Sequence, residues 1–314
     1  MVSTGSTYGL PFEIPAGLLA FAERGEAWTT WLDVLPGLVR DVVDEWELTY
    51  DGDPMHGYCA LVVPVRTAGG RPAVVKFAWP HDEEEHEHLG LQALHGNGAV
   101  SLYRADPRRH VMLLERLHAD EDLRSVWDVE ACEITANLYK RIHIPALPQL
   151  RTLSSYIGRW NADMARLPAN APIPRRLVEQ SISLATDFVS DTATNGTMIH
   201  GDLHYENVLA GDREPWLVID PKPMSGDPHY EVAPLLWNRW DEVVESGNVR
   251  DAVRRRFHSV VDTAGLDEDR ARDWVVVREM HNAMWTVEDH PEGFDQEARE
   301  WVTRCVAIAK AVQE

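Results

Sequence analysis

The chain has 314 residues, which is long enough for one large domain or two smaller ones with a sizeable core. Its 51 acidic and 30 basic residues give a formal net charge of -21, which argues against a nucleic-acid polymer as partner. The charge fits a cationic small molecule, although an acidic surface that serves only solubility would give the same balance.

The targeting and redox features of the sequence predict a cytoplasmic protein. Its three cysteines, Cys59, Cys132 and Cys305, are too far apart for a disulfide framework or a metal motif. Residues 1–9 have neither the basic region nor the apolar region of a signal peptide, and no apolar run has the length of a membrane span. We therefore expect no membrane partner; the oligomeric state is left open.

In chain order, the first strand pattern surrounds a loop rich in turn residues. Residues 45–48 and 59–65 have strand patterns, and the loop between them, residues 50–58, contains Gly52 and Gly57. The two glycines do not form G-x-G-x-x-G, so the letters alone fit a plain turn equally well. Because the loop precedes a strand with a single lysine, we interpret it as a cover over nucleotide phosphates.

That lysine, Lys76, stands inside the apolar strand of residues 73–78. A buried ammonium needs an anionic partner, whereas a lysine at a sheet edge could extend to solvent. Residues 82–94 begin with acidic side chains and continue as an amphipathic helix. We expect Glu87 to be the partner because two leucines share its helix face, with Glu84 as second choice and a solvated helix face as the alternative.

A further pair of strand patterns, residues 100–103 and 110–114, leads to Glu115 and Leu117, where a kinase hinge would bind the nucleotide base. Beyond residue 117 the apolar spacing is helical, over residues 126–144, 153–167, 175–194, 230–244, 248–264, 268–289 and 294–311. The expected fold is α+β and bilobed, with a small antiparallel-sheet nucleotide-binding lobe at residues 1–117 and a larger helical catalytic and substrate lobe at residues 118–314.

The strongest motif is His-Gly-Asp-Leu-His-Tyr-Glu-Asn at residues 200–207, which fits the H-x-D-x-x-x-x-N loop of kinase-fold phosphotransferases. In this template Asp202 is the catalytic base and Asn207 is a Mg²⁺ ligand. A turn-rich segment at residues 211–215 lies between two strand patterns, which predicts a hairpin that returns Asp220 as a second metal ligand. The alternative, that these residues only cap turns, loses weight because the loop and the hairpin occur together.

Residues 220–239, which begin Asp-Pro-Lys-Pro, resemble the streptomycin 6-phosphotransferases and their hydroxyurea-kinase relatives, an aminoglycoside/hydroxyurea antibiotic resistance kinase family. Residues 113–117 and 138–145 are similar to the same family. The resemblance implies a protein-kinase-like aminoglycoside phosphotransferase fold and an antibiotic kinase that uses ATP and Mg²⁺. It also implies that Lys76 contacts phosphate.

The acceptor that this resemblance implies is streptomycin, with hydroxyurea or another small metabolite as the alternative. Gly201 stands where protein kinases have an arginine, and no A-P-E motif follows Asp220, so a protein kinase is the weaker enzyme hypothesis and a nucleotide-binding pseudokinase the non-enzyme one. Because streptomycin carries two guanidinium groups, carboxylates are expected to bind it. The candidate carboxylates are Asp227, Glu231, Asp241, Glu242, Glu288 and Asp289.

Overall fold

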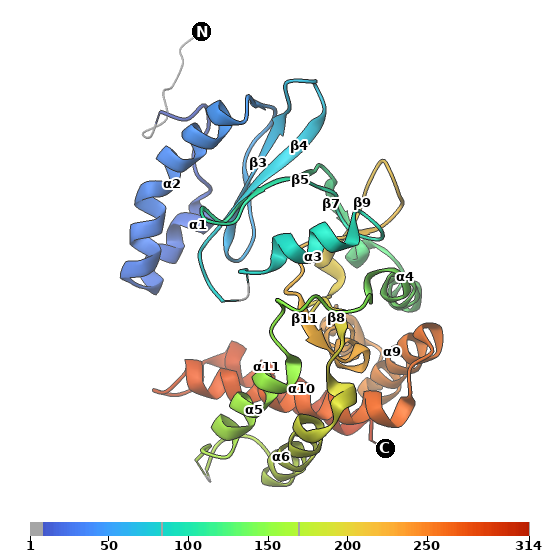
Figure 1. Ribbon diagram of the computed structural model, residues 1–314. Coiled ribbons are helices and arrows are strands. Elements are labelled where there is room, and N and C mark those ends of the chain that lie inside the picture. The colour runs from blue at the N-terminus through green and yellow to red at the C-terminus, as the bar shows by residue number, and fades with distance from the viewer. Residues whose placement is uncertain (1–8, 83, 169, 314) are drawn as a thin grey trace. The chain divides into compact units, whose positions relative to one another are not determined.

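The computed structural model describes residues 9–82, 84–168 and 170–313, and the chain divides into two compact units between Leu117 and His118 (Figure 1). Unit 1 is built on a six-stranded antiparallel sheet with the order β1-β3-β4-β6-β5, and β2 also pairs with β3. Its strands are β1 (Thr49–Tyr50), β2 (Met55–His56), β3 (Ala60–Arg66), β4 (Pro72–Ala78), β5 (Leu102–Asp106) and β6 (Val111–Glu115).

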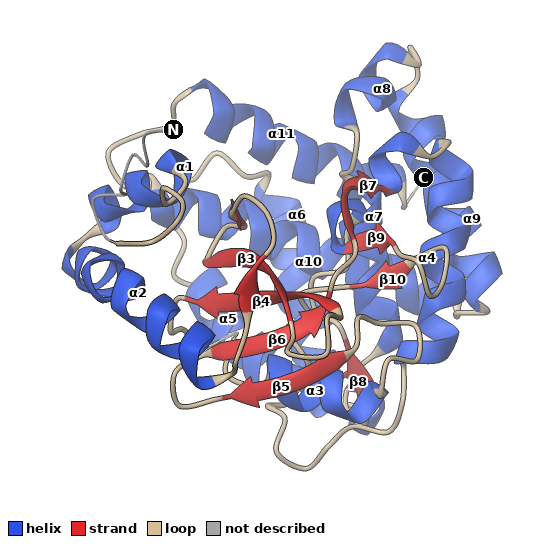
Figure 2. Ribbon diagram, turned by 90° about the horizontal axis from the view of Figure 1, so that it is seen from above, coloured by secondary structure: helices blue, strands red, loops and turns tan. Residues whose placement is uncertain are grey.

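The N-terminal helices of unit 1, which the sequence patterns did not predict, cover its sheet. They are α1 (Ala16–Leu19), the 3₁₀ helix η1 (Ala20–Arg24) and the long α2 (Glu26–Glu45). The apolar side chains of α2 share one core with the inward side chains of β3 and β4, and α2 runs beside the sheet in Figure 2. This core holds the lysine strand in place.

The strand expected at residues 45–48 is wrong. Helix α2 continues to Glu45, Trp46 caps it, and Glu47 has a φ of 54°. Trp46 and Leu48 are buried in the core, so their alternation with polar residues reflects a helix end and not a strand. The helix expected at residues 82–94 is shorter than predicted, because α3 spans only Glu87–Leu94.

Unit 2 contains two small sheets within a helical body. One has the order β10-β9-β7 and the other pairs β11 with β8. The strands are β7 (His118–Asp122), β8 (Thr197–Ile199), β9 (Val208–Ala210), β10 (Leu217–Val218) and β11 (Met224–Gly226). The α-helices are α4 (Asp128–Ile142), α5 (Leu153–Met164), α6 (Arg175–Ser190), α7 (Ala233–Leu236), α8 (Trp240–Glu245), α9 (Val249–Ala264), α10 (Glu268–Asp289) and α11 (Gln296–Ala311). Short 3₁₀ helices are η2 (Leu123–Ser125), η3 (Thr192–Thr194), η4 (Tyr205–Asn207) and η5 (Pro228–Val232).

The single helix expected at residues 230–244 is also wrong. The structure has η5, α7 and α8 there, and Arg239 adopts a left-handed conformation with a φ of 45° between the last two. Buried Arg256 from α9 donates to the carbonyl oxygens of Leu236 and Asn238. These bonds take the place of helical N–H donors, so the chain can turn at this point.

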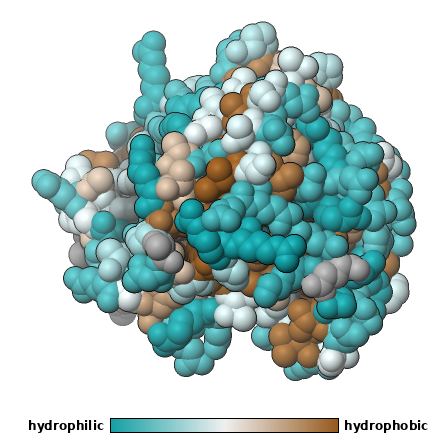
Figure 3. All heavy atoms as spheres, turned by 90° about the horizontal axis from the view of Figure 1, so that it is seen from below, coloured by the Kyte–Doolittle hydropathy of each residue, from teal (hydrophilic) through white to brown (hydrophobic). Residues whose placement is uncertain are grey.

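No helix in the described part of the chain is long and apolar enough to cross a membrane. The face drawn in Figure 3 is mostly hydrophilic, and hydrophobic side chains appear on it only in smaller groups.

Candidate functional site

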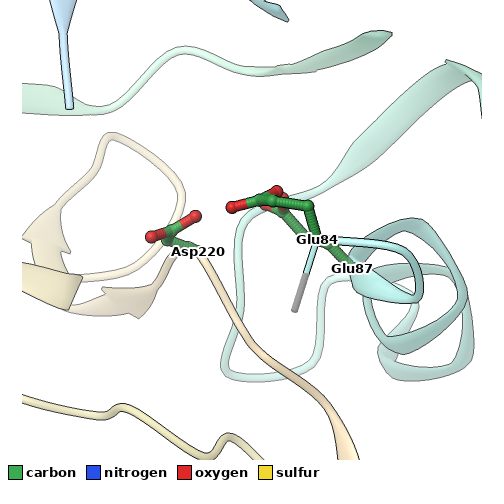
Figure 4. Close-up of side chains that lie close together, drawn as sticks. All are labelled: Glu84, Glu87 and Asp220. Carbon is green, nitrogen blue, oxygen red and sulfur yellow. The ribbon is translucent and has the colours of Figure 1, made fainter. Parts of the chain in front are cut away.

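Lys76 lies on an internal strand, opposite Val62 of β3 and Met112 of β6, so it is not an edge lysine. Its Nζ is 2.5 Å from Oε2 of Glu87 and 3.2 Å from Oε2 of Glu84. The side chains of Lys76, Glu87 and Glu84 are only 8%, 1% and 3% exposed, respectively. Figure 4 shows both glutamate carboxylates reaching the same place from α3 and the turn before it. Because all three charged side chains are buried, the two carboxylates hold the ammonium in a fixed position.

The loop of residues 50–58, which contains Gly52 and Gly57, is supported by the same sheet. Gly52, between β1 and β2, has a φ of 149°, and a Cβ there would lie 3.3 Å from the ring of Pro64, so glycine is needed. Gly57 has no such constraint, since a Cβ would meet nothing within 4 Å. Beside Gly52, Asp51 accepts two 2.8 Å hydrogen bonds from Arg116. The loop is therefore anchored at its first glycine.

Glu115 lies at the end of β6, and its side chain is turned to the protein. Its carboxylate accepts a 3.0 Å hydrogen bond from the N–H of Ser101, and its own N–H donates to the oxygen of Ser101 at 2.9 Å. Leu117 ends unit 1 two residues later. Any contact from this segment to a nucleotide base would come from the main chain after β6.

In unit 2, the catalytic loop is closed by hydrogen bonds between its own ends. The amide Nδ2 of Asn207 donates to the main-chain carbonyl oxygen of Asp202 at 2.9 Å. The oxygen of Asn207 accepts from the N–H of Ile219, and Nε2 of His200 lies 2.9 Å from the oxygen of Ile219. These bonds bring the segment that ends at Asp220 against the loop.

The hairpin predicted between residues 208 and 220 is present. Strands β9 and β10 pair antiparallel, with Val218 opposite Val208. Asp220 follows in a left-handed conformation, with a φ of 55°. Its two carboxylate oxygens are each 3.1 Å from Nζ of Lys222.

Asp220 and Asn207 both carry side-chain oxygens, the type of ligand that Mg²⁺ prefers. Because the Nδ2 group of Asn207 donates to Asp202, its amide oxygen is the atom that can bind a cation. With the carboxylate of Asp220, this gives the oxygen ligands that Mg²⁺ prefers.

The sequence patterns assigned Glu231 of η5 to the acceptor, but its carboxylate supports this loop. Its carboxylate accepts from the N–H groups of His200 and Gly201, at 3.1 and 2.6 Å, and contacts Nε2 of His143 at 2.8 Å. The hydroxyl of Tyr139 donates to its carbonyl oxygen. Burial alone would raise the pKa of Glu231, but the bonds and charge of His143, with the bonds to the loop, lower that pKa. The carboxylate is therefore ionised and holds the turn.

Gly201 explains why the loop lacks the arginine of protein kinases. Its φ is 86°, and a Cβ there would lie 2.7 Å from the oxygen of Lys222. A side chain would need the left-handed conformation and would also clash with the backbone.

Two of the six carboxylates expected to bind a cationic acceptor are committed elsewhere, which corrects that expectation. Glu231 supports the loop, and it is 1% exposed. Asp227, also 1% exposed, accepts from Arg270 at 2.5 Å and from the indole of Trp274 at 2.7 Å. Neither can reach a ligand without breaking a buried network.

A loop with Asp202 and Asn207 five positions apart, and a hairpin that returns Asp220 to it, defines a phosphotransferase of the protein-kinase-like fold. The chain belongs to the aminoglycoside/hydroxyurea antibiotic resistance kinase family, which matches residues 45–290. This confirms the resemblance noted in the sequence.

Relatives of known activity are similar over most of their length. A streptomycin 6-kinase of Streptomyces glaucescens is 39% identical over 302 residues, which cover 95% of this chain and 97% of the relative. A hydroxyurea phosphotransferase of Kitasatospora aureofaciens is 35% identical over 289 residues, which cover 90% of this chain and 82% of the relative.

Solved structures confirm the predicted fold class. The choline kinase LicA of Streptococcus pneumoniae has a TM-score of 0.58 at 15% identity, covering 89% of this chain and 99% of that one. A thermostable mutant of the aminoglycoside phosphotransferase APH(4)-Ia, solved in a ternary complex with ADP and hygromycin B, has a TM-score of 0.56 at 14% identity, covering 87% of this chain and 97% of that one.

Proposed function

We propose that this protein is a cytoplasmic kinase that transfers the γ-phosphoryl group of ATP to a hydroxyl group of streptomycin in the presence of Mg²⁺. The observation that carries the proposal is the catalytic loop, in which hydrogen bonds join Asp202, Asn207 and the segment that ends at Asp220. The 39% and 38% identities to two streptomycin 6-kinases support this acceptor and its 6-hydroxyl.

In this proposal the residues have distinct roles. Asp202 orients the acceptor hydroxyl and accepts its proton. Asn207 and Asp220 would hold Mg²⁺, which when bound neutralises charge on the phosphates. Lys76, fixed by Glu87 and Glu84, would contact the phosphates that are not transferred.

The remaining proposed roles concern nucleotide binding and the two units of the chain. The loop with Gly52 and Gly57 would cover the phosphates, and the main chain from Glu115 to Leu117 would contact the base. Residues 1–117 would then form the nucleotide-binding lobe and residues 118–314 the catalytic and substrate lobe.

A cationic acceptor fits the charge near the end of α10. Burial, followed by the neighbouring carboxylates Asp163 and Asp289, raises the pKa of Glu288. On the same helices, the rings of Trp160 and Trp285 lie 4.9 Å apart. Carboxylates and aromatic rings are both groups that can bind a guanidinium.

The test is turnover of Mg·ATP with streptomycin, other aminoglycosides and hydroxyurea, followed by product mass. Streptomycin should gain one phosphoryl group, and its KM should rise with salt because exposed attractions are screened. Neutral hydroxyurea, which the 35% identical relative makes the second candidate, should show little salt effect. Turnover of hydroxyurea with streptomycin inert would reject the acceptor and keep the phosphotransfer chemistry.

A further inference from the structure

A lysine of unit 2 lies where a cation would bind Asp220. Lys222 follows Asp220 by two positions, and its Nζ is 3.1 Å from both carboxylate oxygens. The two side chains are 15% and 34% exposed, so the pair is accessible to a ligand. An ammonium that contacts both oxygens occupies the bidentate face of the carboxylate, which a divalent cation also uses.

The backbone keeps Lys222 at this place. The N–H of Lys222 donates to the main-chain oxygen of His200 at 2.8 Å. A Cβ added to Gly201 would lie 2.7 Å from the main-chain oxygen of Lys222, so the two backbones pack closely. Pro221 and Pro223 flank it, and each ring fixes its own φ and restricts the residue before it. The lysine is therefore tied to the first turn of the catalytic loop.

The position has a chemical consequence. Protein kinases hold two Mg²⁺ ions between the nucleotide phosphates and the two side chains that correspond here to Asn207 and Asp220. A second divalent ion on the same face of Asp220 would be repelled by the ammonium of Lys222. An ammonium has three donors, so a lysine can bind a carboxylate and a phosphate oxygen at once.

We propose that Lys222 takes the place of one of these metal ions, so that the enzyme works with a single Mg²⁺ per nucleotide. Lys222 is then a catalytic residue that contacts the nucleotide phosphates. The inference rests on the proposed kinase function, since it needs a bound nucleotide, but it does not depend on which acceptor is used.

The first test counts metal ions in the full chain bound to a non-hydrolysable ATP analogue, with Mn²⁺ as the probe read by electron paramagnetic resonance. The wild-type complex should hold one Mn²⁺ per chain, and two would overturn the proposal. This count uses no acceptor. If one Mn²⁺ is found per chain and streptomycin is inert in the separate kinase assay, the acceptor is rejected and the role of Lys222 stands. A chain that binds no nucleotide would overturn both.

The second test compares three lysine variants. Lys222→Met should admit a second Mn²⁺ and lose about 10²-fold in kcat at low free Mg²⁺, as expected for removing one group that stabilises charge in the transition state. Higher free Mg²⁺ should restore part of that loss. Lys222→Arg keeps the charge and should keep one Mn²⁺, and Lys310→Met, at an exposed lysine of α11, should match wild type.

A Lys222→Met protein with one Mn²⁺ and unchanged kcat would overturn the proposal. Should that variant fail to fold, the Mn²⁺ counts of wild type and of Lys222→Arg still decide, because two ions in either would contradict a lysine that replaces a metal.

Discussion

Each unit of this protein pairs a lysine with carboxylate, but the surroundings of the two pairs differ. In unit 1, Lys76 is 8% exposed and lies between Glu84 and Glu87, which are 3% and 1% exposed. In unit 2, Lys222 and Asp220 are 15% and 34% exposed. A buried pair that loses one partner leaves an uncompensated charge, whereas a more exposed pair can bind a ligand beside its partner. We infer that the first cluster is a fixed element and that the second can bind a ligand.

The largest effect on catalysis is expected at Asp202. Asp202→Ala should reduce kcat by about 10²- to 10⁴-fold, because proton transfer by a positioned side chain contributes that much. Nucleotide affinity should stay near wild type, since the Lys76 cluster is untouched. Steady-state kinetics and a nucleotide titration measure the two quantities.

A matched control for this prediction is Asp212→Ala. Asp212 is on the hairpin between β9 and β10, and its side chain is 95% exposed. It should behave as wild type. Near-normal kcat in Asp202→Ala would remove this residue from the mechanism and leave unit 2 without an assigned base.

The second prediction tests whether the Lys76 cluster is fixed. Lys76→Met should weaken nucleotide binding and destabilise the protein by about 3–5 kcal/mol, because it leaves buried carboxylates without their cation. Glu87→Gln should weaken nucleotide binding more than Glu84→Gln, since the contact of Glu87 is shorter, 2.5 against 3.2 Å. Urea unfolding and nucleotide titration report both effects. Nucleotide affinity equal to that of wild type in all three variants would contradict a role for this cluster at the phosphates.

Much of this arrangement follows from local sequence patterns. The β9–β10 hairpin was predicted because turn residues stand between two apolar runs. Helix α10 has the predicted bounds, residues 268 and 289, because a long periodic segment with an Asp cap specifies its own ends. The contact of Glu87 with Lys76 was predicted because the partner lies on the next helix along the chain.

Features that depend on distant segments could not be predicted. The place of Glu231 depends on contacts with residues 143 and 200, which come from separate parts of the chain. The break after α7 depends on Arg256, seventeen positions beyond Arg239. Helix α2 ends at Glu45 because the side chains beyond it pack into the sheet core, which overrides the strand pattern of residues 45–48.

The third prediction concerns Glu231, which is buried like Glu87 but has no lysine. Glu231→Gln replaces one carboxylate oxygen by an NH₂ group that faces N–H donors, so the catalytic turn should loosen. We expect kcat to fall about tenfold to a hundredfold with nucleotide affinity unchanged, and a loss of roughly 2–3 kcal/mol in unfolding free energy. Kinetics and urea unfolding measure these, with Glu297→Gln at an exposed position of α11 as control.

Acid dependence gives a second readout of Glu231. The pKa of Glu231 is lowered by folding, so its contribution to stability is present above the unfolded-state pKa and is lost as the pH falls through the folded one. The unfolding free energy of wild type should therefore decline in acid more steeply than that of Glu231→Gln. Equal slopes would mean that folding does not lower the pKa of this carboxyl group.

The smallest effect on catalysis is expected at Glu279 of α10, whose carboxyl group is fully buried. Burial raises its pKa to about 8, against 4.5 without burial. A raised pKa means that stability is greatest below the unfolded value and is lost as the pH rises through the folded one. The unfolding free energy of wild type should thus fall by roughly 1.4 kcal/mol per pH unit from this group between those two pKa values.

Glu279→Gln should remove that slope and leave kcat unchanged. Urea unfolding at pH 5 and pH 8 measures the slope and steady-state kinetics measure kcat, with Glu300→Gln as the control. A wild-type slope that persists in the Gln variant would place the ionisation elsewhere, and a large fall in kcat would show that this buried carboxyl group belongs to the functional site.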